Sequence, residues 1–331
     1  MKNFKRTLLP ALLAAAVLSG ACSEKGGSGP LPDITGKAGE VEIVSAKAQW
    51  EAEPGTAIRE VLADTYPYLP QSEALFRLYN VPLESFTQVF KLHRNMINLR
   101  IADSLEASFS VARNVWAQPQ TVVTINASSE LEAAEYVRQN GSKLVKIFEQ
   151  AERDRSMANA EKYQNTSLDL FVEQMFGGTP FIPSNYSLKK QNGDFLWISY
   201  ETTYTNQGLF IYKFPYSGDF QFTPKYLIEK RDDVMKENVP GTAEGSYMIT
   251  NPNIVPGFEW RTAGGRRFAE VRSLWDTYND FMGGPFILDA FLSKDGKEII
   301  VTEGFVYAPK YNKRDYVRQL EAILYSWHWS E

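Results

Sequence analysis

The side chains best suited to chemistry are scarce in this chain, which holds two histidines and one cysteine among 331 residues. His93 stands in the sequence His-Arg-Asn at the entrance to an apolar run, where an imidazole could act as a general base or anchor a ligand. The structural alternative, which we favour, is that His93 hydrogen-bonds a loop while Arg94 pairs with a carboxylate. We expect His328, between two tryptophans, to serve packing at the C-terminal end.

Motifs for cofactors and metals are absent from the sequence. It has no phosphate-binding loop, no Gly-x-Gly-x-x-Gly after a strand, no Gly-x-Ser-x-Gly elbow and no His-Glu-x-x-His. Two histidines and one cysteine offer too few ligands for a zinc site. Asp295-Gly296 lacks the further oxygen ligands of a calcium loop and predicts a hairpin turn instead. We therefore expect neither a metal nor a cofactor.

Carboxylate pairs are the remaining route to catalysis, because the chain has 40 acidic residues. A hydrolase of envelope or dietary polymers, using such a pair or His93, is our alternative function. Two carboxyl groups facing each other about 5 to 10 Å apart in a pocket would favour the enzyme. A broad exposed apolar patch would favour binding without catalysis.

Aromatic residues are the most prominent feature, at 13% of the chain with seven tryptophans. They gather in Phe195-Leu-Trp197 and in Asp280-Phe-Met-Gly-Gly-Pro-Phe286, among other segments. Flat rings beside polar groups suit stacking on sugars or on apolar peptide segments, although a single strand aromatic is more often part of a core. Our candidate binding surface, with no catalytic residue assigned, comprises Phe281, Met282, Gly283, Gly284, Phe286, Trp197 and His93.

The segment from Asp280 to Phe286 carries the strongest part of this hypothesis. We expect Gly283, Gly284 and Pro285 to form a tight connection between two long strands. A turn needs only small or polar residues, so the large apolar groups around it either pack against another part of the chain or remain available to a partner.

The N-terminal residues predict export and lipidation rather than structure. Residues 1–21 combine three basic residues with an apolar run that is too short to span a bilayer permanently, which is typical of a signal peptide. Small residues lead into Cys22, which resembles the acylated cysteine of bacterial lipoproteins. Residues 22–38 are rich in Gly, Ser and Pro and predict a flexible tether. We expect a palmitate-bearing lipid anchor that holds the protein on the cell envelope, at the outer membrane.

The rest of the chain predicts alternating short strands and amphipathic helices. Expected helices include 56–65, one long helix after Ser128 or Ser129 that extends to Ala151, 167–176 ending at Gly177, and a helix capped by Thr223 with Pro224 at its first position. Asn312 and Asp315 predict the cap of a last helix. Expected strands include 95–101, 121–125, 266–275, 286–292 and 298–307, with Asn192-Gly193 as a hairpin turn.

These elements predict an α+β fold with mainly antiparallel sheets and packed helices, in two lobes. We place an N-terminal α+β lobe at 39–175 and a C-terminal α+β lobe at 180–331. Acidic residues outnumber basic ones by 40 to 35 without a basic stripe, which excludes nucleic acid as the expected partner.

From about Val41 to Trp327, the order of segments resembles an uncharacterised family of lipoproteins of Bacteroides-type bacteria, domain of unknown function 4837. The resemblance implies an envelope lipoprotein and supplies no catalytic residues. We therefore expect a non-enzymatic protein that binds an envelope protein or a glycan. The segments that carry the resemblance are His93–Asn95, 115–120, 195–197, 207–212, 245–248, 280–286 and 304–310.

Overall fold

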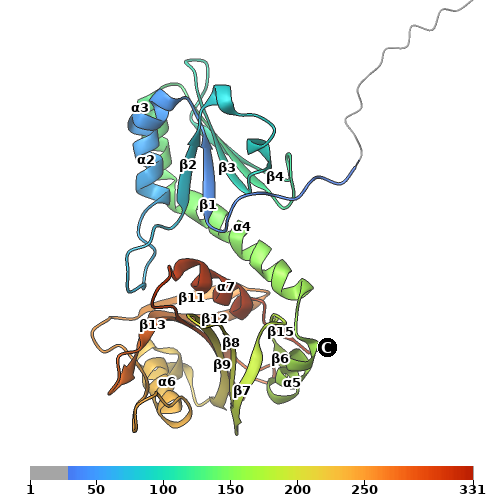
Figure 1. Cartoon of the computed structure of the whole chain (residues 1–331), viewed down its shortest axis with the longest axis vertical. Helices are drawn as coiled ribbons and strands as arrows, with labels where there is room; N and C mark the ends of the chain where they lie inside the picture. Colours follow the sequence, from blue (N-terminus) through green and yellow to red (C-terminus); the bar gives the residue numbers. More distant parts are fainter. Residues whose placement is uncertain (1–28, 331) are drawn as a thin grey trace, which may run out of the picture. The chain divides into compact units, whose positions relative to one another are not determined.

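The computed structural model describes residues 29–330, and from Pro32 onward they form one compact unit (Figure 1). Two separate sheets divide this unit, and we call residues 32–162 the N-terminal lobe and residues 163–330 the C-terminal lobe. The α+β class and the two lobes are thereby confirmed. The signal peptide, Cys22 and the first part of the tether lie outside the described residues.

The N-terminal lobe is built on a five-stranded sheet with the order β2-β1-β3-β5-β4. Its first four strands run parallel, and only β4 is antiparallel to its neighbour. The parallel pairing differs from our antiparallel expectation because all five residues of β1 are buried, as suits a strand covered on both faces. The strands are β1 (Glu40–Val44), β2 (Arg77–Val81), β3 (Asn95–Ile101), β4 (Ser108–Arg113) and β5 (Thr121–Ala127).

Helices of the N-terminal lobe pack against this sheet around Phe76, Ile97 and Phe148. The expected long helix is in fact two, because the chain breaks at Asn140. Ser129 caps the first of them by accepting a hydrogen bond from the Glu132 N–H at 3.2 Å. The helices are α1 (Lys47–Glu51), α2 (Glu53–Leu62), α3 (Glu130–Gln139) and α4 (Gly141–Lys162), with short 3₁₀ turns η1 (Leu83–Ser85) and η2 (Phe90–Leu92).

The C-terminal lobe contains an antiparallel eight-stranded sheet with the order β10-β12-β13-β14-β9-β8-β7, and β11 pairs with β12. Strand alternation sends successive side chains into two cores on opposite faces. The strands are β7 (Ser187–Asn192), β8 (Phe195–Glu201), β9 (Asn206–Pro215), β10 (Tyr247–Thr250), β11 (Gly257–Ala263), β12 (Arg266–Tyr278), β13 (Gly283–Leu292) and β14 (Glu298–Tyr307); β6 (Gly178–Thr179) and β15 (His328–Trp329) form a separate pair.

Each face of the larger sheet has its own helices (Figure 1). α7 (Arg314–Tyr325) covers one face together with α5 (Thr166–Phe176), which we had assigned to the N-terminal lobe but which packs into the C-terminal core. α6 (Pro224–Asn238), preceded by η3 (Asp219–Phe222), covers the other face. Its cap is the expected one, because Thr223 accepts a hydrogen bond from the Tyr226 N–H.

Two turns lie at other positions in the structure than the sequence predicted. Gly283 and Gly284 lie within β13, paired with Asp276 and Trp275, and the turn is formed by residues 279–282. Gly284 is required there because a Cβ would lie 2.0 Å from the Val306 carbonyl oxygen. The hairpin between β7 and β8 turns at Gly193 and Asp194, one residue later than expected.

The cap of α7 also differs from our expectation. The helix begins at Arg314, and neither Asn312 nor Asp315 caps it. Asp315 instead accepts hydrogen bonds from the Arg314 guanidinium, at 2.9 and 2.7 Å. The capping carboxylate comes from the N-terminal lobe, because Glu73 accepts hydrogen bonds from the first backbone N–H groups of the helix.

Candidate functional site

The turn between β12 and β13 presents an apolar side chain entirely to solvent. Phe281 is fully exposed, with a relative accessibility of 104%. The turn itself is held in place, because Asp280 accepts hydrogen bonds from the Phe281 N–H at 2.7 Å and from the Thr242 hydroxyl at 2.5 Å. Asn279, the residue before Asp280, has a left-handed backbone conformation with a φ of 57°. The ring is thus displayed by an ordered turn.

Beside this turn lies a small aromatic recess of about 110 Å³. Trp197 from β8 and Met282, the last residue of the turn, both line it, although they lie 85 positions apart in the sequence. Trp275 on β12 is fixed in the wall by a hydrogen bond from its Nε1 to the Val306 carbonyl oxygen at 3.2 Å. The recess is lined further by Asn206, Val239, Pro240, Gly241, Met248, Thr277, Phe305 and Tyr307.

Trp197 is the residue of the candidate surface that shapes this recess most. Its ring makes edge contacts with Phe210 and Phe305, at centroid distances of 5.7 and 6.4 Å. Its Nε1 is buried and has no hydrogen-bond partner among the described residues. An indole N–H in that state costs free energy until a partner accepts from it.

Phe286 does not line the recess and belongs to the buried core on this face of the sheet. Phe286 is 2% exposed and packs under the Arg231 guanidinium, whose carbon lies 4.0 Å from the ring centroid. Arg231 and Glu303 form a fully buried ion pair with two N–H donors of the guanidinium. Of the seven residues we selected, Phe281 is therefore fully solvent-exposed, Trp197 and Met282 line the recess, and Phe286 belongs to the core.

His93 lies elsewhere, at the start of β3 in the N-terminal lobe. It is buried, its Nδ1 lies 3.0 Å from the Asn95 carbonyl oxygen, and its Nε2 lies 3.7 Å from the Glu40 carboxylate. Burial lowers the pKa of His93, and the hydrogen bond to Asn95 and the charge of Glu40 oppose that shift. His93 therefore contacts the carbonyl oxygen of a strand residue rather than a loop, and it lies in a different lobe from the Phe281 turn.

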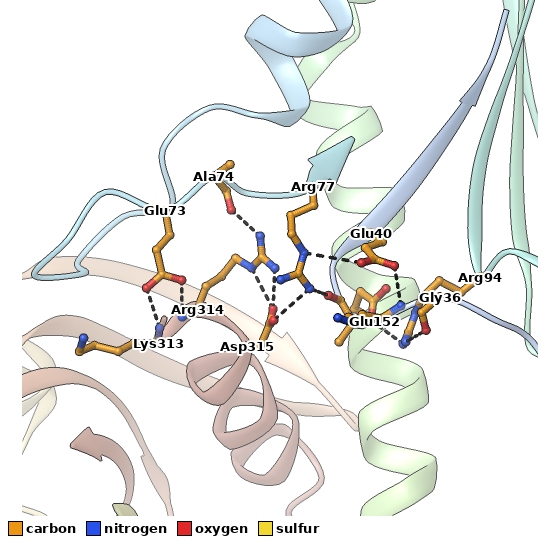
Figure 2. Close-up of polar contacts among 12 residues, drawn as sticks. Gly36, Glu40, Glu73, Ala74, Arg77, Arg94, Glu152, Lys313, Arg314 and Asp315 are labelled. Atoms are coloured by element: carbon orange, nitrogen blue, oxygen red, sulfur yellow. Dashed lines mark hydrogen bonds and ion pairs between the residues drawn. The ribbon is translucent and has the colours of Figure 1, made fainter. Parts of the chain in front are cut away.

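The two residues after His93 attach β3 to α4. Arg94 donates to Glu152 Oε2 at 2.7 Å, and Asn95 donates to Glu152 Oε1 at 2.6 Å. Figure 2 shows the Arg94–Glu152 pair together with the contacts around Arg314. Near the C-terminal end of the chain, the His328 ring packs beside the Phe181 ring, with centroids 4.7 Å apart and planes inclined at 38°.

A larger cleft of about 1100 Å³ lies between the lobes and collects several ionisable groups. Arg272 binds two carboxylates there, donating to Glu270 at 2.8 and 3.1 Å and to Glu321 at 2.7 Å. Burial alone would raise the pKa of Glu321, but Arg272 and Arg153 hold it well below its usual value. Burial raises the pKa of Glu149, which also lines the cleft.

Sequence reasoning missed most walls of the aromatic recess. Trp275 and Thr277 lie two residues apart on one strand and so share a face, which is a signal that the sequence contains. Val239, Pro240 and Tyr307 carry no such signal, because only the sheet order brings them to the same place. Among residues 29–330, no cluster of three metal-ligating side chains occurs, and no helix is long and apolar enough to cross a membrane.

Comparison with known families finds a separate match for each lobe. Residues 165–326 match a family described as domain of unknown function (DUF4837), and residues 35–161 match another, domain of unknown function (DUF8532). The resemblance we noted is confirmed, but its extent is narrower, because residues 93–95 and 115–120 fall in the second family. No curated protein matches the chain.

Among solved structures, a protein from Bacteroides thetaiotaomicron VPI-5482, with a crystal structure at 1.50 Å resolution, is similar to part of this chain. It shares 8% identity with this chain at a TM-score of 0.26. The match covers 45% of this chain and 43% of that chain, so less than half of either protein is aligned.

Proposed function

We propose that the protein is a cell-envelope lipoprotein that binds a partner protein through the Phe281 turn and the aromatic recess. This turn and recess lie within residues 165–326, which match the DUF4837 family. The observation that carries this proposal is the full exposure of Phe281 on an ordered turn beside the recess. Aromatic residues, Phe among them, are enriched in protein–protein interfaces relative to the rest of the protein surface.

The size of the recess supports a protein partner over a glycan. Small-molecule sites usually measure about 300 to 1,000 Å³, whereas this recess measures about 110 Å³. It has room for one side chain of a partner and little more. A partner that also buries Phe281 would therefore make a two-point contact, with one ring inserted into the partner and one partner side chain inserted here.

The neighbouring surface extends the contact area. Tyr247 and Tyr278 face each other across β10 and β12 with stacked rings 5.0 Å apart, and Tyr278 is 46% exposed. Tyrosine offers contact area at a low cost in conformational entropy, because its side chain has few rotatable bonds. The Phe281 turn thus lies beside further residues of the type that binding surfaces use.

Envelope location rests on the sequence alone. Cys22 follows a signal-like segment, and it precedes a Gly- and Ser-rich tether. A lipid anchor at that position would keep the binding surface near envelope partners.

One observation supports the alternative function as a hydrolase, namely the ionisable groups in the larger cleft. Glu149 has a raised pKa and Glu321 a lowered one, and acid–base pairs in enzymes differ in this way. However, both oxygens of Glu321 are engaged, one by Arg153 and the other by Arg272. A carboxylate committed to two arginines is better suited to joining elements than to attacking a substrate, and we therefore place binding first.

Site-specific photo-crosslinking in intact cells tests the proposal. A benzoyl-phenylalanine at position 281 should yield one discrete crosslinked protein, while the same group at Leu131, an exposed residue of α3, should not. A second substitution, Met282→Ala, should reduce the yield from position 281 without changing the melting temperature. Equal products from positions 281 and 131, or none from position 281, would refute the proposal.

A further inference from the structure

A third cavity, of about 490 Å³, lies where α4 and α7 approach strands β8 and β9. We propose that this cavity binds a saccharide that carries a carboxylate group. The proposal is independent of the Phe281 turn. The residues that carry it are Arg94, Arg155, Tyr186, Tyr200, Gln207 and Gln319.

Gln207 gives the cavity an unpaired polar group on a rigid element. It lies on β9, in register with Tyr200 on one side and Val306 on the other, so the sheet fixes its position. The residue is only 4% exposed, and its Oε1 has no hydrogen-bond partner among the described residues. An unpaired buried acceptor is costly, and a hydroxyl group donating to it would remove that cost.

The charges around the cavity are unbalanced. Arg94 and Arg155 both line it, and both bind the same carboxylate, Glu152, at 2.7 and 2.9 Å. Arg155 donates also to Asn95 Oδ1 at 2.6 Å, but that oxygen is neutral. Within residues 29–330, no acidic residue lines the cavity, so the two guanidinium groups share the one negative charge of Glu152. The surplus positive charge favours an anionic ligand group.

The remaining lining is suited to sugar rings and their hydroxyl groups. The rings of Tyr186 and Tyr200 lie 6.0 Å apart at an angle of 42° and offer apolar faces. Amide side chains line the cavity as well, on Asn159, Asn185 and Gln319, and each can donate and accept hydrogen bonds. The volume lies within the range of small-molecule sites and accommodates one or two sugar rings.

These features together distinguish the ligand class. Phosphate alone would use the arginines and leave the tyrosines and amides without a role. A neutral sugar would leave the surplus charge uncompensated. A saccharide with a carboxylate satisfies the charge, the unpaired Gln207 oxygen and the aromatic faces at once.

Calorimetric titration of the whole protein tests the proposal, with disaccharides of galacturonate, glucuronate and mannuronate as probes. Their neutral counterparts and acetate serve as controls. We expect at least one acidic disaccharide to bind at least tenfold more tightly than its neutral counterpart, and we expect no binding of acetate. Binding of none of the three acidic probes, or equal binding of acidic and neutral forms, would overturn the proposal.

Two substitutions locate the binding to this cavity. Gln207→Met removes the amide at similar volume, and it should weaken binding of the acidic disaccharide tenfold or more while the melting temperature stays equal or rises. Gln319→Ala, at an exposed position, should weaken binding without affecting folding. Phe281→Ala is the matched control and should bind the sugar as the wild type does. Undiminished binding by both cavity variants would place the ligand elsewhere and refute this site.

Discussion

Glu73 caps a helix that begins 241 residues later in the chain, at Arg314. Its carboxylate accepts hydrogen bonds from the backbone N–H groups of Lys313 at 2.6 Å and Arg314 at 3.1 Å (Figure 2). The first N–H groups of a helix have no partner within the helix, and the N-terminus favours negative charge. The N-terminal lobe therefore completes an element of the C-terminal lobe.

Removing this cap should destabilise the whole protein. We expect Glu73→Ala to lower the free energy of unfolding by about 0.5 to 2 kcal/mol, the usual range for lost helix caps. Urea unfolding monitored by tryptophan fluorescence measures the change. Glu84→Ala, at an exposed position in η1, is the control and should stay within about 0.5 kcal/mol of wild type. Equal effects of both substitutions would contradict the capping role.

The buried pair of Arg231 and Glu303 should be intolerant of single changes. Glu303→Leu removes the fully buried carboxylate from the Arg231 guanidinium and leaves it only the partly exposed Asp232, at 3.2 Å, as an acidic partner. We expect this change to cost about 3 to 5 kcal/mol. The double variant Arg231→Met with Glu303→Leu removes both charges and should recover most of that loss. A double-mutant cycle from guanidinium unfolding measures the coupling, and additive effects would show that the two charges do not depend on each other.

His93 should make stability depend on pH in a defined direction. Burial lowers its pKa from 6.5 in the folded state, so below that value the unfolded chain binds the proton more readily. Stability attributable to His93 should therefore fall as the pH drops below 6.5. His93→Gln should cost about 0.5 to 1.5 kcal/mol at pH 7.5 and should reduce this part of the pH dependence. Parallel melting profiles of both proteins between pH 5 and 8 would rule out this contribution.

Two phenylalanines five residues apart should respond in opposite ways to truncation. Phe286→Ala creates a cavity in a packed core and should cost about 3 to 5 kcal/mol. Phe281→Ala should leave the melting temperature within a few degrees of wild type while it weakens partner capture. Calorimetric melting of the two variants distinguishes them. A large loss of stability in Phe281→Ala would indicate a structural role for the turn.

Cys22 should carry the lipid anchor. We expect mass spectrometry of the mature N-terminus to show a diacylated or triacylated Cys22, because the preceding segment is typical of exported lipoproteins. Cys22→Ala should release the protein from membranes after a salt wash. An unmodified cysteine, or a Cys22→Ala protein that still sediments with membranes, would disprove lipidation.

Local signals predicted most of the individual elements. The strands 95–101 and 298–307 and the cap at Thr223 depend on nearby residues, and the structure confirms each of them. The break at Asn140 was missed because the apolar spacing continues through it. Gly141 lets α4 pass Val61, with a missing Cβ that would lie 2.9 Å from a Val61 methyl group. That contact involves α2, which the local pattern does not include.

Long-range features could not be predicted in the same way. The parallel pairing of β1 with β2 and β3 depends on crossover connections, and a strand's own sequence does not state its neighbours. The candidate surface was partly predictable, because aromatic content identified Trp197 and the 280–286 segment. Aromatic content could not show that His93 lies in the other lobe from Trp197 and the 280–286 segment, because only the complete topology separates these residues.

Helix α4 has a consequence for how the protein responds to load. Its 22 residues correspond to about 33 Å of continuous helix. Two consecutive side chains face different partners, since Glu152 binds Arg94 and Asn95 of the first sheet while Arg153 binds Glu321 on α7. A pull or twist applied to one lobe would therefore reach the other through adjacent positions on one continuous helix.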